Sequence, residues 1–127
     1  MVSTDYSLQN KNRLTVIDLF CGCGGISLGF QMAGFNVLYG LDNNKDALAT
    51  FKRNFPGAQT DYRKIEDISI DEIPQSDIIV GGPPCVNFSL AKGSRANVLD
   101  GIKLVQAFLR IVYLRKPKYW IMENVPE

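Results

Sequence analysis

The sequence has no histidine, only three cysteines and almost no excess of charge of either sign. Without histidine the chain cannot build a Ser-His-Asp or Cys-His triad, a histidine-ligated metal site or an imidazole base. The formal net charge of +1 provides no bulk field to hold nucleic acid, so any such binding must come from local patches. Any catalysis must therefore rest on other side chains.

Long apolar runs are also missing. No run approaches the roughly 18 residues that span a bilayer. Residues 1–13 are polar and lack the apolar core of a signal peptide, so we expect a loose polar leader there. An odd number of cysteines without such a signal favours a reducing compartment, and we expect a cytoplasmic protein. A chain of 127 residues with 46% hydrophobic residues fits one globular domain.

Short apolar runs rich in β-branched residues alternate with helical patterns along the chain. Strands are predicted at 14–20, 35–41, 77–80 and 119–122, and helices at 25–32, 45–55 and 100–115. This order indicates βαβ units and predicts an α/β fold, with a mostly parallel sheet and helices on both of its faces. In such sheets ligands bind beyond the carboxyl ends of the strands.

The end of the chain is unusual for this architecture. Glu127 comes about five residues after a predicted strand that is buried on both faces, and such a strand is normally followed by an element that covers it. We therefore expect a truncated sheet, that is, a fragment or one half of a split protein.

The first cluster of unusual residues, at 18–25, has the sequence DLFCGCGG and follows the first predicted strand. Glycines at such a turn let the backbone approach a ligand and present the next helix N-terminus to it. Asp42 closes the second predicted strand, where an acid can accept from both ribose hydroxyls. This pattern supports any nucleotide-like cofactor, although Ser27 stands where the dinucleotide pattern has its third glycine. A turn that simply needs glycines is the alternative.

The second cluster, GGPPCVNFS at 81–89, surrounds Cys85. Pro83 and Pro84 fix the backbone just before this cysteine and so direct its sulfur. A thiolate is the strongest protein nucleophile near neutral pH. A small buried apolar group is the usual role of a single cysteine, but the loop position favours a nucleophile here.

Charged residues complete the pattern. Glu123 follows the last predicted strand, where a carboxylate can act as an acid or anchor a ring nitrogen, although a lone glutamate at a strand end is usually solvated. Lys92 and Arg95 lie in the segment after Cys85, where a phosphate backbone could approach. The spacing of Cys21 and Cys23 is not that of a zinc site, and we predict no metal.

These segments occur in a characteristic order: DLFCGCGGISLGF, Asp42, EDI at 66–68, GGPPCVNFS and ENVPE. Together they resemble the DNA (cytosine-5) methyltransferase family, over residues 16–127 and only the first half of the family's length. The resemblance implies a Rossmann-like fold that uses S-adenosylmethionine. It also implies that residues 14–127 are the N-terminal part of a catalytic domain that lacks its target-recognition region and C-terminal part.

The resemblance assigns roles residue by residue. Asp42 would hold the ribose, Asn43 would lie near the adenine, and Asp67 and Ile68 would flank it. Cofactor contacts are implied for Phe20, Gly22, Gly24, Gly25, Asp42, Asn43, Asp67, Ile68 and Leu104. Cys85 would be the nucleophile and Glu123 would contact N3 of the cytosine. Substrate contacts are expected from Pro83, Pro84, Ser89, Lys92 and Arg95. Val86 departs from the glutamine usual after the cysteine.

The implied reaction transfers a methyl group to C5 of a cytosine flipped out of duplex DNA. Because the sequence-reading part is missing, we expect the chain to need a complementary polypeptide. Three alternatives stay open: an RNA cytosine methyltransferase acting on tRNA, a non-catalytic remnant that binds cofactor or a partner chain, and a dinucleotide-binding oxidoreductase. The intact Cys85 argues against the remnant, and Ser27 with the Pro-Pro-Cys segment argues against the oxidoreductase.

Overall fold

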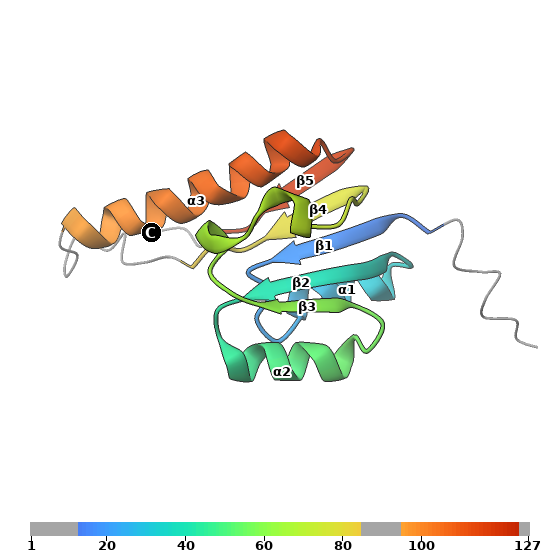
Figure 1. The fold of residues 1–127 in the computed structure, drawn as a ribbon. Coiled ribbons are helices and arrows are strands. Elements are labelled where there is room, and N and C mark those ends of the chain that lie inside the picture. Colours follow the sequence, from blue (N-terminus) through green and yellow to red (C-terminus); the bar gives the residue numbers. More distant parts are fainter. Residues whose placement is uncertain (1–12, 85–94, 125–127) are drawn as a thin grey trace, which may run out of the picture.

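A computed structural model describes residues 13–84 and 95–124, with side chains of the second range described from Leu99 onward. Its elements are β1 (Thr15–Leu19), α1 (Gly25–Met32), β2 (Asn36–Asp42), α2 (Lys45–Asn54), β3 (Gln59–Tyr62), the 3₁₀ turns η2 (Ile65–Asp67) and η3 (Ile70–Glu72), β4 (Ile78–Gly81), α3 (Arg95–Arg115) and β5 (Tyr119–Met122). The described residues thus form an α/β fold (Figure 1).

The sheet is parallel throughout its described strands, in the order β3-β2-β1-β4-β5. From β1 the chain adds β2 and β3 on one side of the sheet, and then adds β4 and β5 on the other side of β1. The carboxyl ends of β1 and β4 therefore flank a topological switch point, which is where such sheets bind ligands. In register, Leu19 lies opposite both Leu41 and Gly81, and Gly81 lies opposite Met122.

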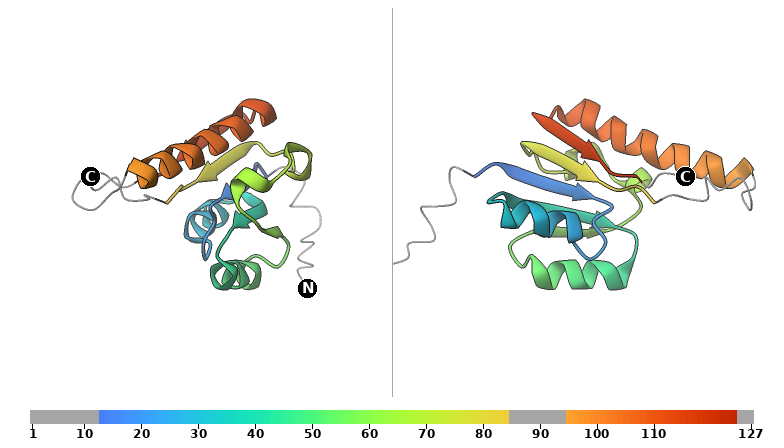
Figure 2. Two further views of the ribbon diagram at one scale, coloured as in Figure 1. Left: turned by 60° about the vertical axis from the view of Figure 1, so that its left-hand side comes forward. Right: turned by 180° about the vertical axis from the view of Figure 1, so that it is seen from behind.

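Helices cover both faces of the sheet, as the alternating pattern predicted (Figure 2). Helices α1 and α2 pack on one face around Val16, Val80 and Phe51, all fully buried. Helix α3 and the two 3₁₀ turns pack on the other, where Phe108 reaches the sheet. Two-sided burial explains why β1 and β4 are nearly continuous apolar runs.

Most predicted elements are present with small shifts at their ends. Helix α3 begins at Arg95, five residues before the predicted start at position 100. Strand β3 was not predicted. Its sequence, QTDY, has no apolar run because it lies at the edge of the sheet and buries no residue fully. Backbone pairing with β2 rather than side-chain burial defines it.

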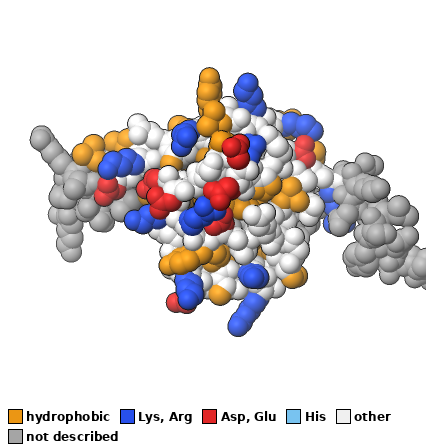
Figure 3. All heavy atoms as spheres, viewed as in Figure 1, with side chains coloured by type: hydrophobic (Ala, Val, Ile, Leu, Met, Phe, Trp, Pro, Cys, Tyr) orange, Lys and Arg blue, Asp and Glu red, His pale blue; other side chains and the backbone are white. Residues whose placement is uncertain are grey.

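On the face seen in Figure 3, basic and acidic side chains are interspersed, in keeping with the formal net charge of +1. Within the described ranges, 13–84 and 95–124, no helix has the length and apolar character needed to cross a membrane.

Candidate cofactor and catalytic site

The turn between β1 and α1 folds back onto β2. The backbone N–H groups of Phe20 and Cys21 both donate to the carbonyl of Leu41, at 2.9 and 3.0 Å. Three of its residues have left-handed φ angles: 68° at Phe20, 53° at Gly22 and 98° at Gly24. A left-handed phenylalanine is uncommon and costs roughly 1 kcal/mol, so packing must hold it in place.

The glycines of this turn serve two different purposes. A Cβ at Gly24 would lie 2.4 Å from Cε2 of Phe55 and 3.0 Å from Cδ2 of Phe51, so this glycine is required by packing. A Cβ at Gly22 or Gly25 would meet nothing within 4 Å. The backbone at these two positions is therefore open to a ligand, and Gly25 begins α1, whose N-terminus favours an approaching negative group.

Asp42, the last residue of β2, ties the turn to the following helix. Its Oδ2 accepts from the N–H of Gly22 at 2.8 Å, and its Oδ1 accepts from the N–H of Asn44 at 2.7 Å. Asn44 in turn caps α2 with its side chain. A carboxylate has about four acceptor sites, so each oxygen of Asp42 can still accept from a ligand hydroxyl.

A small cavity of about 40 Å³ lies beside Asp42, and a wider one of about 350 Å³ adjoins it. Both are lined by Asn43, Pro84 and Leu104, and the smaller one also by Phe20 and Asp42. The structure thus brings together four residues that the resemblance assigned to the cofactor and one, Pro84, that it assigned to the substrate. They come from the ends of β1 and β2, the segment after β4, and α3.

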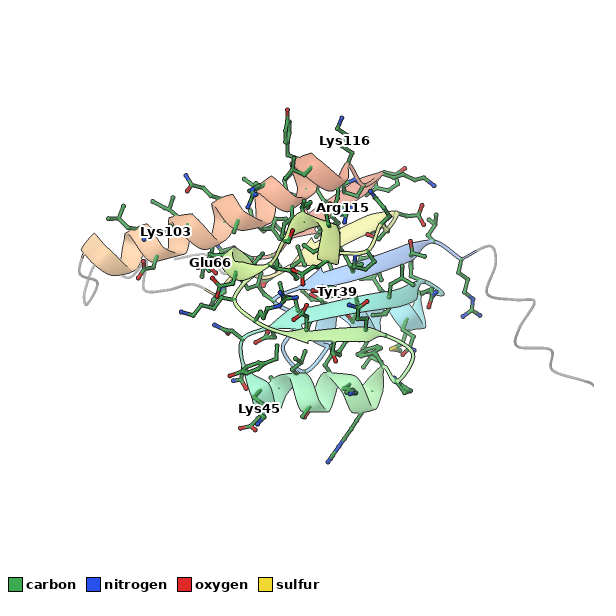
Figure 4. The ribbon with its side chains drawn as sticks, in the orientation of Figure 1. Tyr39, Lys45, Glu66, Lys103, Arg115 and Lys116 are labelled. Atoms are coloured by element: carbon green, nitrogen blue, oxygen red, sulfur yellow. The ribbon has the colours of Figure 1, made fainter. Side chains whose placement is uncertain are left out.

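Two assigned residues lie elsewhere. Asp67 is exposed at the end of η2 and lines neither cavity, whereas Ile68 is buried beneath α3 and lines a neighbouring cavity of about 200 Å³. Ile65 and Glu66 contribute to the Asp42 cavity instead. Figure 4 shows Glu66 near α3, at the carboxyl-end side of the sheet.

Strand β3, which was not predicted, fixes where the chain reaches the Asp42 cavity. Tyr62, its last residue, lies opposite Asp42, so the segment that enters the cavity begins directly after it. A signal was available: a parallel strand is due within a few residues after a helix and a Pro-Gly turn. Arg63 then fixes the segment, donating to Asp61 Oδ2 at 2.6 Å and to Glu72 Oε2 at 3.0 Å. The Arg63 guanidinium also lowers the pKa of both carboxyls.

Glu123 lies beside Gly82, at the start of the segment that leads to Cys85. Its N–H donates to the carbonyl of Gly81 at 3.0 Å, which continues the pairing of β5 with β4. Its side chain covers Gly82, where a Cβ would lie 2.9 Å from Oε2 of Glu123. The carboxylate therefore sits beside the residue three positions before Cys85.

Several assigned residues lie outside what the structure describes. Cys85, Ser89 and Lys92 fall between the described ranges, and Arg95 opens α3 without a described side chain. The two residues before the cysteine are described: Pro83 is buried and Pro84 is exposed. The described part of this segment thus ends at Pro84, which lines the Asp42 cavity, and Gly82, two residues earlier, lies beside Glu123.

Asp18 is a buried acid beneath the glycine turn that the sequence analysis did not single out. It is 1% exposed, and its Oδ2 accepts from the hydroxyl of Ser27, itself fully buried, at 2.7 Å. Among the described residues its Oδ1 has no hydrogen-bond partner. Burial raises the pKa of Asp18 to about 7, against the lowering effect of the Ser27 hydroxyl, and the nearby Asp42 charge raises it further.

Because Asp18 is buried, we expect Asp18→Asn to change how the unfolding free energy depends on pH. A carboxyl whose pKa is about 7 when folded and about 3.8 when unfolded binds more protons in the folded state, so folding stability falls as pH rises from about 4 to 7. The asparagine variant lacks this slope. We expect it to match the wild type near pH 5 and to exceed its unfolding free energy by about 2 kcal/mol at pH 8. Denaturant melts at both pH values measure this, and a variant less stable at pH 8 would contradict it.

Taken together, the parallel sheet with its switch point, the open glycine turn, Asp42 and the cavity at the strand ends are the features of an α/β protein that binds a nucleoside-containing cofactor. S-adenosylmethionine fits these residues: the open Gly25 accommodates a close ligand, and Asp42 has free acceptor capacity.

Comparisons with known proteins specify the family. The profile described as C-5 cytosine-specific DNA methylase matches residues 14–127. The Type II methyltransferase M.HgiGI of Herpetosiphon aurantiacus is 41% identical over 115 residues, which cover 88% of this chain and 90% of that protein. The Type II methyltransferase M.HindV of Haemophilus influenzae is also 41% identical, over 87% of this chain and 37% of its own length.

Solved structures agree on the fold. An Escherichia coli prophage protein described as a DNA modification methyltransferase superposes with a TM-score of 0.74 at 32% identity, over 89% of this chain and 32% of that one. The Dnmt2 methyltransferase of S. pombe shares the fold, with a TM-score of 0.66 at 18% identity over 89% of this chain and 34% of that one.

The chain belongs to the C-5 cytosine-specific DNA methylase family. It covers most of M.HgiGI but only 37% of M.HindV and 32% of the E. coli protein. Family membership removes the dinucleotide-dependent oxidoreductase from the alternatives.

Proposed function

We propose that this chain carries the cofactor-binding and nucleophilic half of an enzyme that methylates C5 of cytosine in DNA. The observation that supports this most is the position of Glu123, whose carboxylate covers Gly82 at the head of the Pro83-Pro84-Cys85 segment. An acid and the approach to a cysteine thus meet at the edge of the sheet where the glycine turn and Asp42 also lie. Residues 14–127 form the N-terminal part of the catalytic domain, after a polar leader at 1–13.

The methyl donor would lie between the glycine turn and the Asp42 cavity. Asp42 would accept from the ribose hydroxyls, and Phe20 and Leu104 would line the adenine pocket together with Ile65 and Glu66. Gly22 and Gly25 leave the backbone free for the amino-acid end. S-adenosylmethionine supplies an electrophilic methyl group on a sulfonium. The residues of the chain would hold the donor and activate cytosine C5, which accepts the methyl group.

Cytosine C5 is a weak nucleophile, and Cys85 and Glu123 would overcome this. The Cys85 thiolate adds to C6 while Glu123 gives a proton to N3, which makes C5 electron-rich. C5 takes the methyl group, and the sulfur of the donor leaves with the bonding electron pair. A base then removes the C5 proton, the C5–C6 double bond re-forms and the cysteine leaves as a thiolate. Glu123 recovers its proton from N3.

The substrate we propose is a cytosine flipped out of duplex DNA, because the base edge is unreachable inside the stack. Pro83, Pro84 and Ser89 would border the base, and Lys92 and Arg95 would contact phosphate. The chain spans only 37% of the length of M.HindV. We therefore propose a complementary polypeptide that supplies target recognition, and a cytoplasmic location for the assembly.

Transfer of a tritiated methyl group tests this proposal. The chain is incubated with labelled S-adenosylmethionine and either duplex DNA or tRNA, alone and with the C-terminal remainder of a longer relative such as M.HindV. We expect label in DNA only when the second polypeptide is present. Label in DNA with the chain alone would overturn the need for a partner, label in tRNA would overturn the substrate, and no label in any mixture would contradict the reaction.

A further inference from the structure

Arg63 lines the Asp42 cavity, yet it has no role in the chemistry proposed above. It is the first residue after β3, and its backbone N–H donates to the carbonyl of Asp42 at 3.2 Å. The three residues that follow it, Lys64, Ile65 and Glu66, line the same cavity. One wall of the cavity therefore begins at Arg63.

The Arg63 guanidinium makes two bidentate contacts with carboxylates. Its Nε and Nη2 donate to Oδ1 and Oδ2 of Asp61, at 2.8 and 2.6 Å. Its Nη1 and Nη2 donate to Oε2 and Oε1 of Glu72, both at 3.0 Å. These contacts use four of the five N–H donors of an arginine, in the paired geometry that matches a carboxylate. A lysine cannot reproduce this arrangement, because its ammonium is a single point charge.

Both carboxylates are also anchored to groups other than Arg63. Asp61 accepts from the hydroxyl of Tyr39, a fully buried residue of β2, at 3.3 Å. Glu72 accepts from the N–H of Ser69 at 3.0 Å, within the capping box of η3. The network thus joins the core of the sheet to η3 and closes the intervening chain into a loop. Isolated exposed ion pairs contribute little to stability, but a network of bidentate contacts holds a segment in one position.

We propose that Arg63 is a positioning residue for the methyl donor: its guanidinium fixes the loop whose residues Ile65 and Glu66 form one wall of the adenosine pocket. The inference rests on the proposed function, which places the adenine in the Asp42 cavity. Arg63 acts here through the loop and not by contact with the reacting atoms. Without the guanidinium the loop loses both bidentate contacts, and the wall of the pocket is no longer held in place.

Calorimetric titration with S-adenosylmethionine tests this, with the full chain alone and together with the complementary polypeptide. We expect Arg63→Gln to raise the Kd about tenfold, since residues that act through others typically change binding by roughly 2- to 30-fold. Arg63→Lys keeps the charge without the paired donors and should raise the Kd about threefold. The matched control Arg53→Gln, which changes an exposed arginine in the last turn of α2, should bind the donor like the wild type.

Two further readouts separate positioning from a general loss of structure. Glu72→Gln should raise the Kd about threefold, but added to Arg63→Gln it should raise the Kd no further, because Glu72 acts through Arg63. In the mixture that methylates DNA, Arg63→Gln should raise the KM for the donor while kcat stays within about twofold of the wild type. The melting temperature should fall by less than about 5 °C, because the network is partly exposed.

The outcomes distinguish failure of this inference from failure of the proposed function. Wild-type affinity in Arg63→Gln, or losses that simply add in the double variant, would overturn the role of Arg63 while donor binding stands. If the wild-type chain binds no donor, either alone or with the complementary polypeptide, the donor site itself is overturned, and this inference with it. Should Arg63→Gln fail to fold, Arg63→Lys and Glu72→Gln decide, and wild-type affinity in both overturns the inference.

Discussion

Gly24→Ala is expected to lower the unfolding free energy by about 3 kcal/mol or more. The left-handed φ of 98° at this position costs a residue with a Cβ about 1–2 kcal/mol. The new methyl would lie 2.4 Å from the ring of Phe55, which cannot retreat because it is 3% exposed and stacked on Phe51 at 4.6 Å between ring centroids. Overpacking of this kind adds about 1–3 kcal/mol. Thermal melting should show a drop in Tm of about 10 °C.

Gly25→Ala, one residue further, is the matched comparison. A Cβ there meets nothing within 4 Å, the φ is not left-handed, and alanine suits the first turn of α1. Folding should be unchanged or slightly strengthened. The methyl occupies the space through which the donor approaches, so we expect affinity for S-adenosylmethionine to fall roughly tenfold. Equal melting temperatures for the two variants would contradict the packing role of Gly24, and unchanged affinity in Gly25→Ala would contradict the placement of the donor.

Gly82→Ala is expected to reduce methyl transfer about a hundredfold while leaving folding nearly intact. The new Cβ would lie 2.9 Å from Oε2 of Glu123, so the carboxylate must move. This side chain is exposed and can shift at little cost in stability, but a displacement of about 1 Å at a reacting group can lower a rate about 10²-fold. The rate is measured as single-turnover transfer in the mixture that methylates DNA.

Two control variants test whether the position and acidity of Glu123 account for the expected loss of rate. Gly57→Ala, in the exposed turn after α2, adds the same methyl with nothing within 4 Å and should leave the rate unchanged. Glu123→Gln keeps the shape of the side chain but not its acidity, and should lose about 10²–10⁴ in rate. If Gly82→Ala transfers at the wild-type rate, Glu123 does not act from the position that the structure shows.

The elements that carry the site could be predicted from sequence because their signals are local. Strand β1 is buried on both faces and is therefore apolar except at Thr15 and Asp18, and Gly34 lies two residues after the end of α1. The meeting of Phe20 and Asp42 follows from one rule, that the carboxyl ends of parallel strands share an edge. That rule needs no knowledge of side-chain packing.

The remaining features depend on contacts between distant positions. Strand β3 is polar because it lies at an edge, so the sequence pattern did not predict it, although Ile65 and Glu66, which follow it closely, line the Asp42 cavity. The different roles of Gly24 and Gly25 depend on where Phe55 packs, 30 residues away along the chain. The Asp18–Ser27 bond likewise joins a strand to a helix, and no spacing rule predicts that an aspartate there loses its solvent.

Covalent trapping tests most directly whether Cys85 is the nucleophile that adds to cytosine in DNA. Duplex DNA containing 5-fluorocytosine is incubated with S-adenosylmethionine, the chain and the complementary polypeptide, and a stable protein–DNA adduct is sought. Fluorine cannot leave C5 as a proton does, so a nucleophile that has added to C6 stays attached. We expect an adduct that disappears in Cys85→Ser and persists in Cys23→Ser. An adduct that survives Cys85→Ser, or none in any mixture that methylates ordinary DNA, would contradict it.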